Sequence, residues 1–357
     1  MKKAIEKRFS RTILAASIAA IGLSAPLAAQ AEDDDLRSLT RPSSEVEVGI
    51  GNVSDSSYKF GDYGRGLENS GAYLIGNVRM NTRSDNNANY LEIIGRNLGL
   101  SGSRDFTIKG GEQGNYGLSF EYDELSKLHS DSYQTPYTGM GSSTLVKPSP
   151  WAISGTVGAN TNISTATMTN LAANMKRFNV ETQRKATGLG VTKQLDGGWD
   201  LALNFKREKK EGTQLTGAVI QTRNFNENRG ATLAPEPVDY TTDLFDVVAR
   251  YAGEELQMQV GYHASLFDSA SQPLVWDNLY YNAASLPGVP GVSTGQGGNA
   301  LTGRHAPMPD NQFHRVKASG GYAISKETRL TGNLSFGRTT QNEAFLPYAT
   351  RWGCEKQ

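Results

Sequence analysis

Few side chains in this sequence could perform chemistry, and they are widely spaced. The histidines are His129, His263, His305 and His314, and the single cysteine is Cys354. Their spacing matches neither a metal site nor a CxxCH haem attachment, and one cysteine cannot form a disulfide framework. One pair could support hydrolysis, because Ser265 follows His263 by two residues and would share its face of a strand.

A hydrolase is therefore one hypothesis, with His263 or His314 as the base and Ser265 or an acidic residue beside it. The GxSxG motif that presents a nucleophilic serine is absent around Ser265. A polar pair that faces water accounts for the same residues without any reaction. The sequence predicts that the protein is not an enzyme and has no catalytic, cofactor-binding or metal-binding residue of its own.

The segment that carries His263 alternates between apolar and polar residues. In LQMQVGYHASLF (256–267), every second residue from Leu256 to Leu266 is apolar or aromatic, and the others up to Ser265 are polar or small. Successive side chains of a strand point to opposite faces, so this pattern predicts a strand with one apolar and one polar face. About eleven such segments occur, including SEVEVGIGNV, YGLSFEYDEL, WDLALNFKRE, LFDVVARYAG, RVKASGGYAI and RLTGNLSFGR.

The connections between these segments alternate between short and long. Tight turns are predicted at 195–198, 252–255 and 325–328, and long polar stretches at about 54–70, 126–175, 211–241 and 267–311. On this alternation, 82–89 and 112–115 fall on the short side, and 99–103 is an unusually short connection on the long side. The basic run KREKKEG (206–212) is expected at the base of a solvated loop. Short turns at one end and long loops at the other are typical of outer-membrane barrels.

The sequence therefore predicts an all-β fold, a transmembrane antiparallel β-barrel. Its apolar face would meet lipid and its polar face, with Lys206 and Arg250, would line the lumen. Aromatic residues near the predicted strand ends are typical of the girdles at membrane surfaces: Tyr116, Trp199, Tyr251, Tyr262 and Tyr322. The mean hydropathy of −0.48 does not fit a bundle of membrane helices. A soluble secreted β protein is a further alternative, which partition into detergent would exclude.

The N-terminus has the composition of a secretory signal peptide. Basic residues precede the apolar run ILAASIAAIGLSAPLAA, and Ala29-Gln30-Ala31 resembles a cleavage site. A membrane-anchoring helix is the alternative, but the apolar run is short. We expect a signal peptide at 1–31, a short periplasmic segment at 32–43 and the barrel domain at 44–357. Cleavage would leave a net charge of about −4, and nothing suggests binding to nucleic acid.

Three segments resemble the MtrB/PioB family of outer-membrane barrels. The most distinctive is LAPEPVDYTTD (233–243), and the others are SEVEVGIGNVSDSSYKFGDYGRGL (44–67) and MPDNQFHRVKASGGYAISKETRLTGNLSFGR (308–338). The stretch KRFNVETQRKATGLGV (176–191) is also similar. The resemblance implies a sheath in the outer membrane that houses a periplasmic decahaem c-type cytochrome, with all haems on that partner. It also implies an outer-surface multihaem cytochrome as a second partner.

Two features depart from the family pattern. Some members carry CxxC near the mature N-terminus, where this chain has AEDDDLRSLTRPSS. The sequence also stops at RWGCEKQ, soon after a strand, so we expect an incomplete barrel with only its N-terminal strands. The alternative function is a general solute porin with an open lumen, which would make the membrane permeable to small polar solutes.

Overall fold

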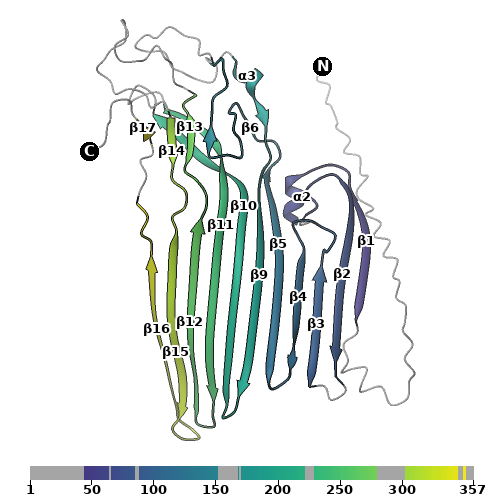
Figure 1. The fold of residues 1–357 in the computed structure, drawn as a ribbon, viewed down its shortest axis with the longest axis vertical. Coiled ribbons are helices and arrows are strands. Elements are labelled where there is room, and N and C mark those ends of the chain that lie inside the picture. The colour runs from purple at the N-terminus through teal and green to yellow at the C-terminus, as the bar shows by residue number, and fades with distance from the viewer. Residues whose placement is uncertain are drawn as a thin grey trace, which may run out of the picture.

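The computed structural model describes residues 44–63, 66–84, 88–151, 168, 170–221, 229–279, 302–344 and 349–350. The predicted signal peptide, the segment 32–43 and Cys354 lie outside these residues. Most of the described chain forms one antiparallel sheet of eleven strands, which lie side by side in a single wall (Figure 1). In pairing order they are β1 Glu45–Val53, β2 Gly71–Arg83, β3 Asn89–Arg96, β4 Asp105–Glu112, β5 Tyr116–Ser130, β9 Val180–Leu195, β10 Trp199–Gln221, β11 Arg229–Ala252, β12 Leu256–Ser269, β15 Asn311–Ala323 and β16 Arg329–Thr340.

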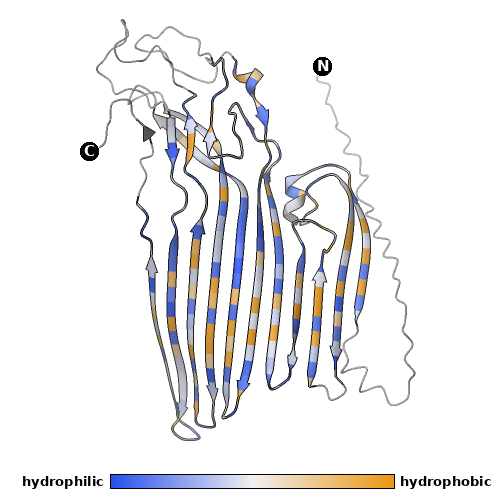
Figure 2. Cartoon of the chain, in the orientation of Figure 1, coloured by the Kyte–Doolittle hydropathy of each residue, from blue (hydrophilic) through white to orange (hydrophobic). Residues whose placement is uncertain are grey.

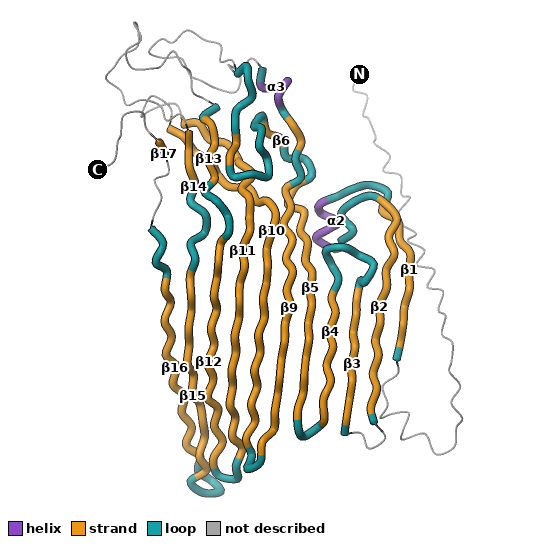
Figure 3. The backbone as a smooth tube through the Cα atoms, viewed as in Figure 1, coloured by secondary structure: helices purple, strands orange, loops and turns teal. Residues whose placement is uncertain are grey.

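The predicted tight turns all lie at one end of this sheet, here named the turn end (Figure 3). Turns at 196–198, 253–255 and 324–328 join β9 to β10, β11 to β12 and β15 to β16. The short connections after β2 and β4 lie at the same end. The long connections lie at the opposite end, named the loop end. The predicted short turns are therefore confirmed at one end, and the long connections after β5 and β12 lie at the other. Within the described residues, no helix is long and apolar enough to cross a membrane.

The two faces of the wall differ sharply in chemistry. Large apolar side chains are exposed on one face, including Val48, Leu118, Leu203, Val260 and Leu334, and the strands appear striped in Figure 2. A soluble protein would bury such a surface, whereas a membrane barrel presents it to lipid. Trp199 and Tyr251 lie 5.1 Å apart at the turn end of this apolar face. The predicted girdle position of Tyr262 is wrong, because Tyr262 lies in the interior of β12.

The apolar band runs obliquely across the strands. On β1 the band is centred on Val48. The residues level with Val48 on later strands, followed through the strand pairing, are Gly76, Glu124, Lys209 and Asp268. On β16 the apolar residues lie nearer the turn end, around Leu334. The shift is about eight residues over ten steps between strands. With a rise of ~3.3 Å per residue and a spacing of ~4.8 Å, the strands lie about 30° from the perpendicular to the band, close to the tilt of membrane barrels.

The loop predicted at 211–241 is wrong for residues 211–221 and 229–241, and residues 222–228 lie outside the described part of the chain. Both strands of the β10–β11 hairpin continue through it in unbroken register, from Trp199↔Tyr251 to Gln221↔Arg229, so the basic run 206–212 is strand rather than loop base. The hairpin leaves its neighbour β9 near Gly212, where φ is +128° and a Cβ atom would lie 2.2 Å from the Glu181 carbonyl oxygen. Glycine is required there because only it tolerates both the conformation and the approach.

Smaller elements from the long connections fold together at the loop end, here named the cap. A four-stranded sheet contains β7 Thr144–Leu145, β13 Leu274–Asp277, β14 Thr302–His305 and β17 Ala349–Thr350. A second pair contains β6 Gln134–Thr135 and β8 Lys176–Arg177, and α3 spans Leu171–Asn174. The long connections predicted at 126–175 and 267–311 are therefore present in position, but their described parts are folded rather than extended.

The part of the wall that contains β3 and β4 extends much less far toward the loop end than the β10–β11 hairpin does. Strands β3 and β4 have eight residues each, and the short connection between them is confirmed. Helix α2, Tyr58–Tyr63, comes from the connection 54–70 and contacts β5 above this hairpin (Figure 1). The Glu124 carboxylate accepts hydrogen bonds from Arg104, at 3.0 Å, and from the Gly102 amide, at 3.0 Å. The Glu124 side chain, 2% exposed, therefore links the β3–β4 hairpin to β5 just beyond the apolar band.

Candidate functional site: the polar face and the cap

The polar face of the wall is lined largely by small residues at the level of the apolar band. On β5 and β9 they include Gly117, Ser119, Gly188 and Gly190. A Cβ atom at Gly190 would lie 2.3 Å from the Ser119 hydroxyl and 2.8 Å from Oδ1 of Asn204, so these neighbours lie close over the glycine. This face therefore presents hydrogen-bonding groups on a shallow surface and leaves room beside it for a large occupant.

Several charged side chains on the polar face bind one another. Arg96 lies 3.2 Å from Asp105, and Arg184 lies 2.6 Å from Glu208. Arg250, predicted to face the lumen, donates to the Gln259 amide oxygen at 3.2 Å. These contacts join neighbouring strands across the face. They are the contacts expected of a surface that meets water or a polar protein rather than lipid.

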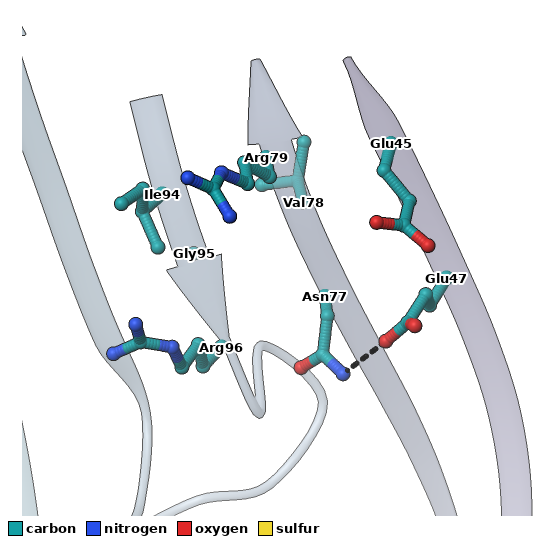
Figure 4. A pocket seen from close by; sticks show the side chains of 8 residues that line it. All are labelled: Glu45, Glu47, Asn77, Val78, Arg79, Ile94, Gly95 and Arg96. Atoms are coloured by element: carbon teal, nitrogen blue, oxygen red, sulfur yellow. Dashed lines mark hydrogen bonds between the residues drawn. The ribbon is translucent and has the colours of Figure 1, made fainter. Parts of the chain in front are cut away.

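A recess of about 270 Å³ lies on the polar side of β1, β2 and β3 (Figure 4). Its charged residues are Glu45, Glu47, Arg79 and Arg96. Asn77 connects two strands here, because it donates to the Glu47 carboxylate at 2.9 Å and accepts from the Asn97 amide at 2.9 Å. Charges of both signs at this spacing suit a polar protein surface or water, and they resemble no catalytic arrangement.

The residues of the hydrolase hypothesis do not assemble into a catalytic site. His263 lies 2.8 Å from Asp246 on the polar face, but Ser265 donates no hydrogen bond to it among the described residues. His314 lies on the apolar face, where its Nδ1 atom is 2.8 Å from the Tyr262 hydroxyl. The two histidines thus face opposite sides of the wall. In the described part of the chain, no group of three or more His, Cys, Asp or Glu residues could hold a metal ion.

The PEPVDY block, residues 235–240, was predicted to lie in a loop, but it is part of β11 and contacts the cap. Pro235 and Pro237 lie beyond the end of β12, on the side of β11 that pairs with β12 lower down. Asp239 marks that side, because its amide donates to Ser271 and its carbonyl accepts from Ala270. Pro235 and Pro237 lie four and two positions before Asp239, so their backbone groups point to the same edge. That edge is unpaired, so a proline there costs no sheet hydrogen bond. The prolines therefore end the sheet on this side and free the edge for the cap.

Glu236, between the two prolines, holds the cap to the hairpin. Its carboxylate is buried, and it accepts from His305 of β14 at 2.7 Å and from the Gln214 amide at 3.2 Å. Because an ionised carboxylate only accepts, Nδ1 of His305 carries the proton in this contact. Tyr133 adds a second link, since its hydroxyl donates to the Leu233 carbonyl at 2.6 Å. Burial raises the pKa of Tyr133, so this hydroxyl stays protonated and able to donate.

An apolar core joins the cap to the hairpin. It contains Tyr137, Leu145, Met168, Leu274, Trp276 and Leu279 from the cap and Ala218 and Ala234 from the hairpin. Both alanines lie on the face that lines the lumen side lower in the sheet. Gly303 lies against the Trp276 ring, where a Cβ atom would lie 2.3 Å from the ring carbons. The cap is thus a packed unit on the polar side of the hairpin.

Two comparisons place this architecture among known proteins. The family model for outer membrane beta-barrel porins of the MtrB/PioB type matches residues 52–356. Outer membrane protein MtrB of Shewanella baltica (strain OS185) is 28% identical over 249 residues, 70% of this chain and 32% of that protein. The chain therefore spans about a third of the length of this curated relative.

Solved structures of OmpT, an outer membrane protein of Vibrio cholerae, are similar in outline. The in-vitro folded form has a TM-score of 0.34 and 8% identity, over 87% of this chain and 72% of that chain. Its trimer form has a TM-score of 0.30 and 8% identity, over 86% and 73%. The family match carries the assignment, and it agrees with the two-faced antiparallel wall. The chain belongs to the MtrB/PioB family of outer-membrane β-barrel porins and resides in the outer membrane.

Proposed function

We propose that this chain forms part of a sheath in the outer membrane that encloses a periplasmic decahaem c-type cytochrome. Electrons would pass from haem to haem through the lumen, across a bilayer that is otherwise an insulator. The family match over residues 52–356 is the observation that carries this proposal. The barrel would supply insulation and position, and the redox chemistry would belong to the cofactors of the partner.

The polar face supports a protein-filled lumen. Small residues such as Gly117 and Gly190 keep this face shallow, and serine, glutamine and asparagine side chains offer both donors and acceptors. The cap and the β10–β11 hairpin provide surface at the loop end, where an outer-surface multihaem cytochrome would dock. We expect the loop end to face the cell exterior, because short turns lie on the periplasmic side of outer-membrane barrels.

Reconstitution in liposomes tests the sheath. The full-length protein, alone or with its decahaem cytochrome, would be inserted into liposomes that contain a redox dye, and dithionite would be added outside. Fast bleaching of the dye is expected only when both proteins are present. In that sample the liposomes should still retain a small trapped sugar. Bleaching that needs no cytochrome, together with loss of the sugar, would refute the sheath.

A general solute porin is the second candidate, favoured by the description of the matching family as porins. A porin has a water-filled lumen, so it would give large and steady open channels in planar bilayers. We expect the full-length protein bound to its cytochrome to give little conductance. Steady channels from that complex would favour the porin instead.

A further inference from the structure

Arg315 and Lys317 lie two positions apart on the polar face of β15, and they are here named the cation pair. Both side chains are exposed, and neither has a hydrogen bond or ion pair in the described part of the chain. Arg315 lies opposite His263 and Gly337, and Lys317 lies opposite Gly261 and Ser335. The described polar face of β12, β15 and β16 contains no carboxylate. Asp246, on the next strand, already binds His263 at 2.8 Å.

Two other arginines on the same face have carboxylate partners on neighbouring strands. Arg96 binds Asp105 and Arg184 binds Glu208. The cation pair, by contrast, has no carboxylate on its own strand face or on the facing residues of β12 and β16. Its glycine and serine neighbours are small, so a large anionic group could approach both side chains from the lumen.

The cation pair lies at the depth of the membrane. Val316, between the two residues, is 49% exposed on the apolar face, in one row with Val247 and Tyr262. Lipid thus lies behind this part of the wall. In a water-filled lumen the two cations would be solvated. In a lumen filled by protein they would lose that water, and a charge without water is stable only beside an opposite charge.

We infer that Arg315 and Lys317 bind carboxylates on the protein that fills the lumen. This inference rests on the proposed function. Arginine matches a carboxylate with two parallel hydrogen bonds, and lysine adds a point charge beside it. Acidic side chains and haem propionates share this chemistry, so either could supply the anion.

The test uses the full-length protein with an affinity tag, expressed together with its decahaem cytochrome. The double variant Arg315→Gln/Lys317→Gln would be compared with wild type by washing the immobilised complex with increasing salt and measuring haem absorbance. We expect the double variant to bind the cytochrome about ten-fold or more weakly. The conservative variant Arg315→Lys/Lys317→Arg should retain most of the cytochrome. The control Lys185→Gln, on the opposite face of β9, should behave as wild type.

The outcomes separate this inference from the function on which it rests. If wild type binds no cytochrome, the sheath proposal fails and this inference fails with it. If wild type and the double variant bind equally at every salt concentration, only the inference is overturned. Heat-modifiable migration in gels would confirm that each variant is a folded barrel. A redox titration identifies the anion: altered haem potentials indicate propionates, and unchanged potentials with weaker binding indicate acidic side chains.

Discussion

Arg104 and Arg207 both pair with a carboxylate just beyond the apolar band, but their surroundings differ. The side chain of Glu124, the partner of Arg104, is 2% exposed, whereas that of Asp243, the partner of Arg207, is 17% exposed. Removing one member of a buried pair leaves a charge without water or a partner, and removing one member of an exposed pair leaves a solvated charge. The two arginines therefore form a matched comparison.

We predict that Arg104→Ala lowers the free energy of unfolding by about 2–3 kcal/mol, because Glu124 loses two donors while buried. Arg207→Ala should lower it less, because Asp243 keeps more contact with water than Glu124 does. Urea unfolding of the full-length protein in detergent micelles, followed by tryptophan fluorescence, measures both. Equal effects of the two substitutions would contradict the burial of Glu124.

Glu236 gives a second prediction at the level of single residues. Glu236→Ala leaves His305 and Gln214 without their acceptor. The free energy that holds the cap on the hairpin should therefore fall by about 1.5–3 kcal/mol. Trypsin added to folded protein should then cut after Arg304 faster than in wild type. The control is Glu211→Ala, a more exposed carboxylate on the same hairpin, which should leave the cleavage rate unchanged. Identical rates for the two variants would remove Glu236 from this role.

The strand elements differ in how well sequence predicts them. Segments inside the apolar band, such as β12, meet lipid on one face and polar groups on the other, so their alternation is strong. Just above the band, from Lys206 to Glu211, both faces of β10 are charged, which removes the contrast. That is why residues 211–221 and 229–241 resemble a loop in sequence although they are strand. Proline at every second position, Pro235 and Pro237, was the available sign of an edge strand.

The link between Glu236 and His305 was beyond sequence reasoning for a different reason. The two residues are 69 positions apart, and they meet only because β14 packs on the hairpin. The Ser265 and His263 pair shows the converse, since correct spacing on one strand face did not produce a hydrogen bond between them. Periodicity therefore predicts the direction of a side chain but not its partner.

At the level of the strand, facing can be tested by introducing charge. Val260 is 45% exposed on the apolar face near the middle of the band on β12, and Gln259 faces the polar side. We predict that Val260→Arg costs about 2–4 kcal/mol, because it places a charge in hydrocarbon. Gln259→Arg should be mild. Folding yield into liposomes measures both, and similar yields for the two variants would reverse the assignment of the faces.

The whole molecule has two ends that differ in size, which gives a test of its orientation. Protease added to intact cells that display the full-length protein should cut within 131–179 or 270–310, the long connections at the loop end. It should spare the turns at Asp196 and Gly253, at the turn end. Fragment masses from gel electrophoresis and mass spectrometry locate the cuts. Cleavage at the two turns in sealed cells would mean that the barrel is inserted the other way.

The wall is uneven at its loop end. Beyond the apolar band, which ends near Phe205 on β10, the hairpin continues to Gln221, about 50 Å along the strand. Beside β3 and β4 the wall stops close to the band. With the loop end outward, as proposed, a large particle such as a phage or an antibody would reach the polar face of the described wall most directly over the low sector of β3 and β4.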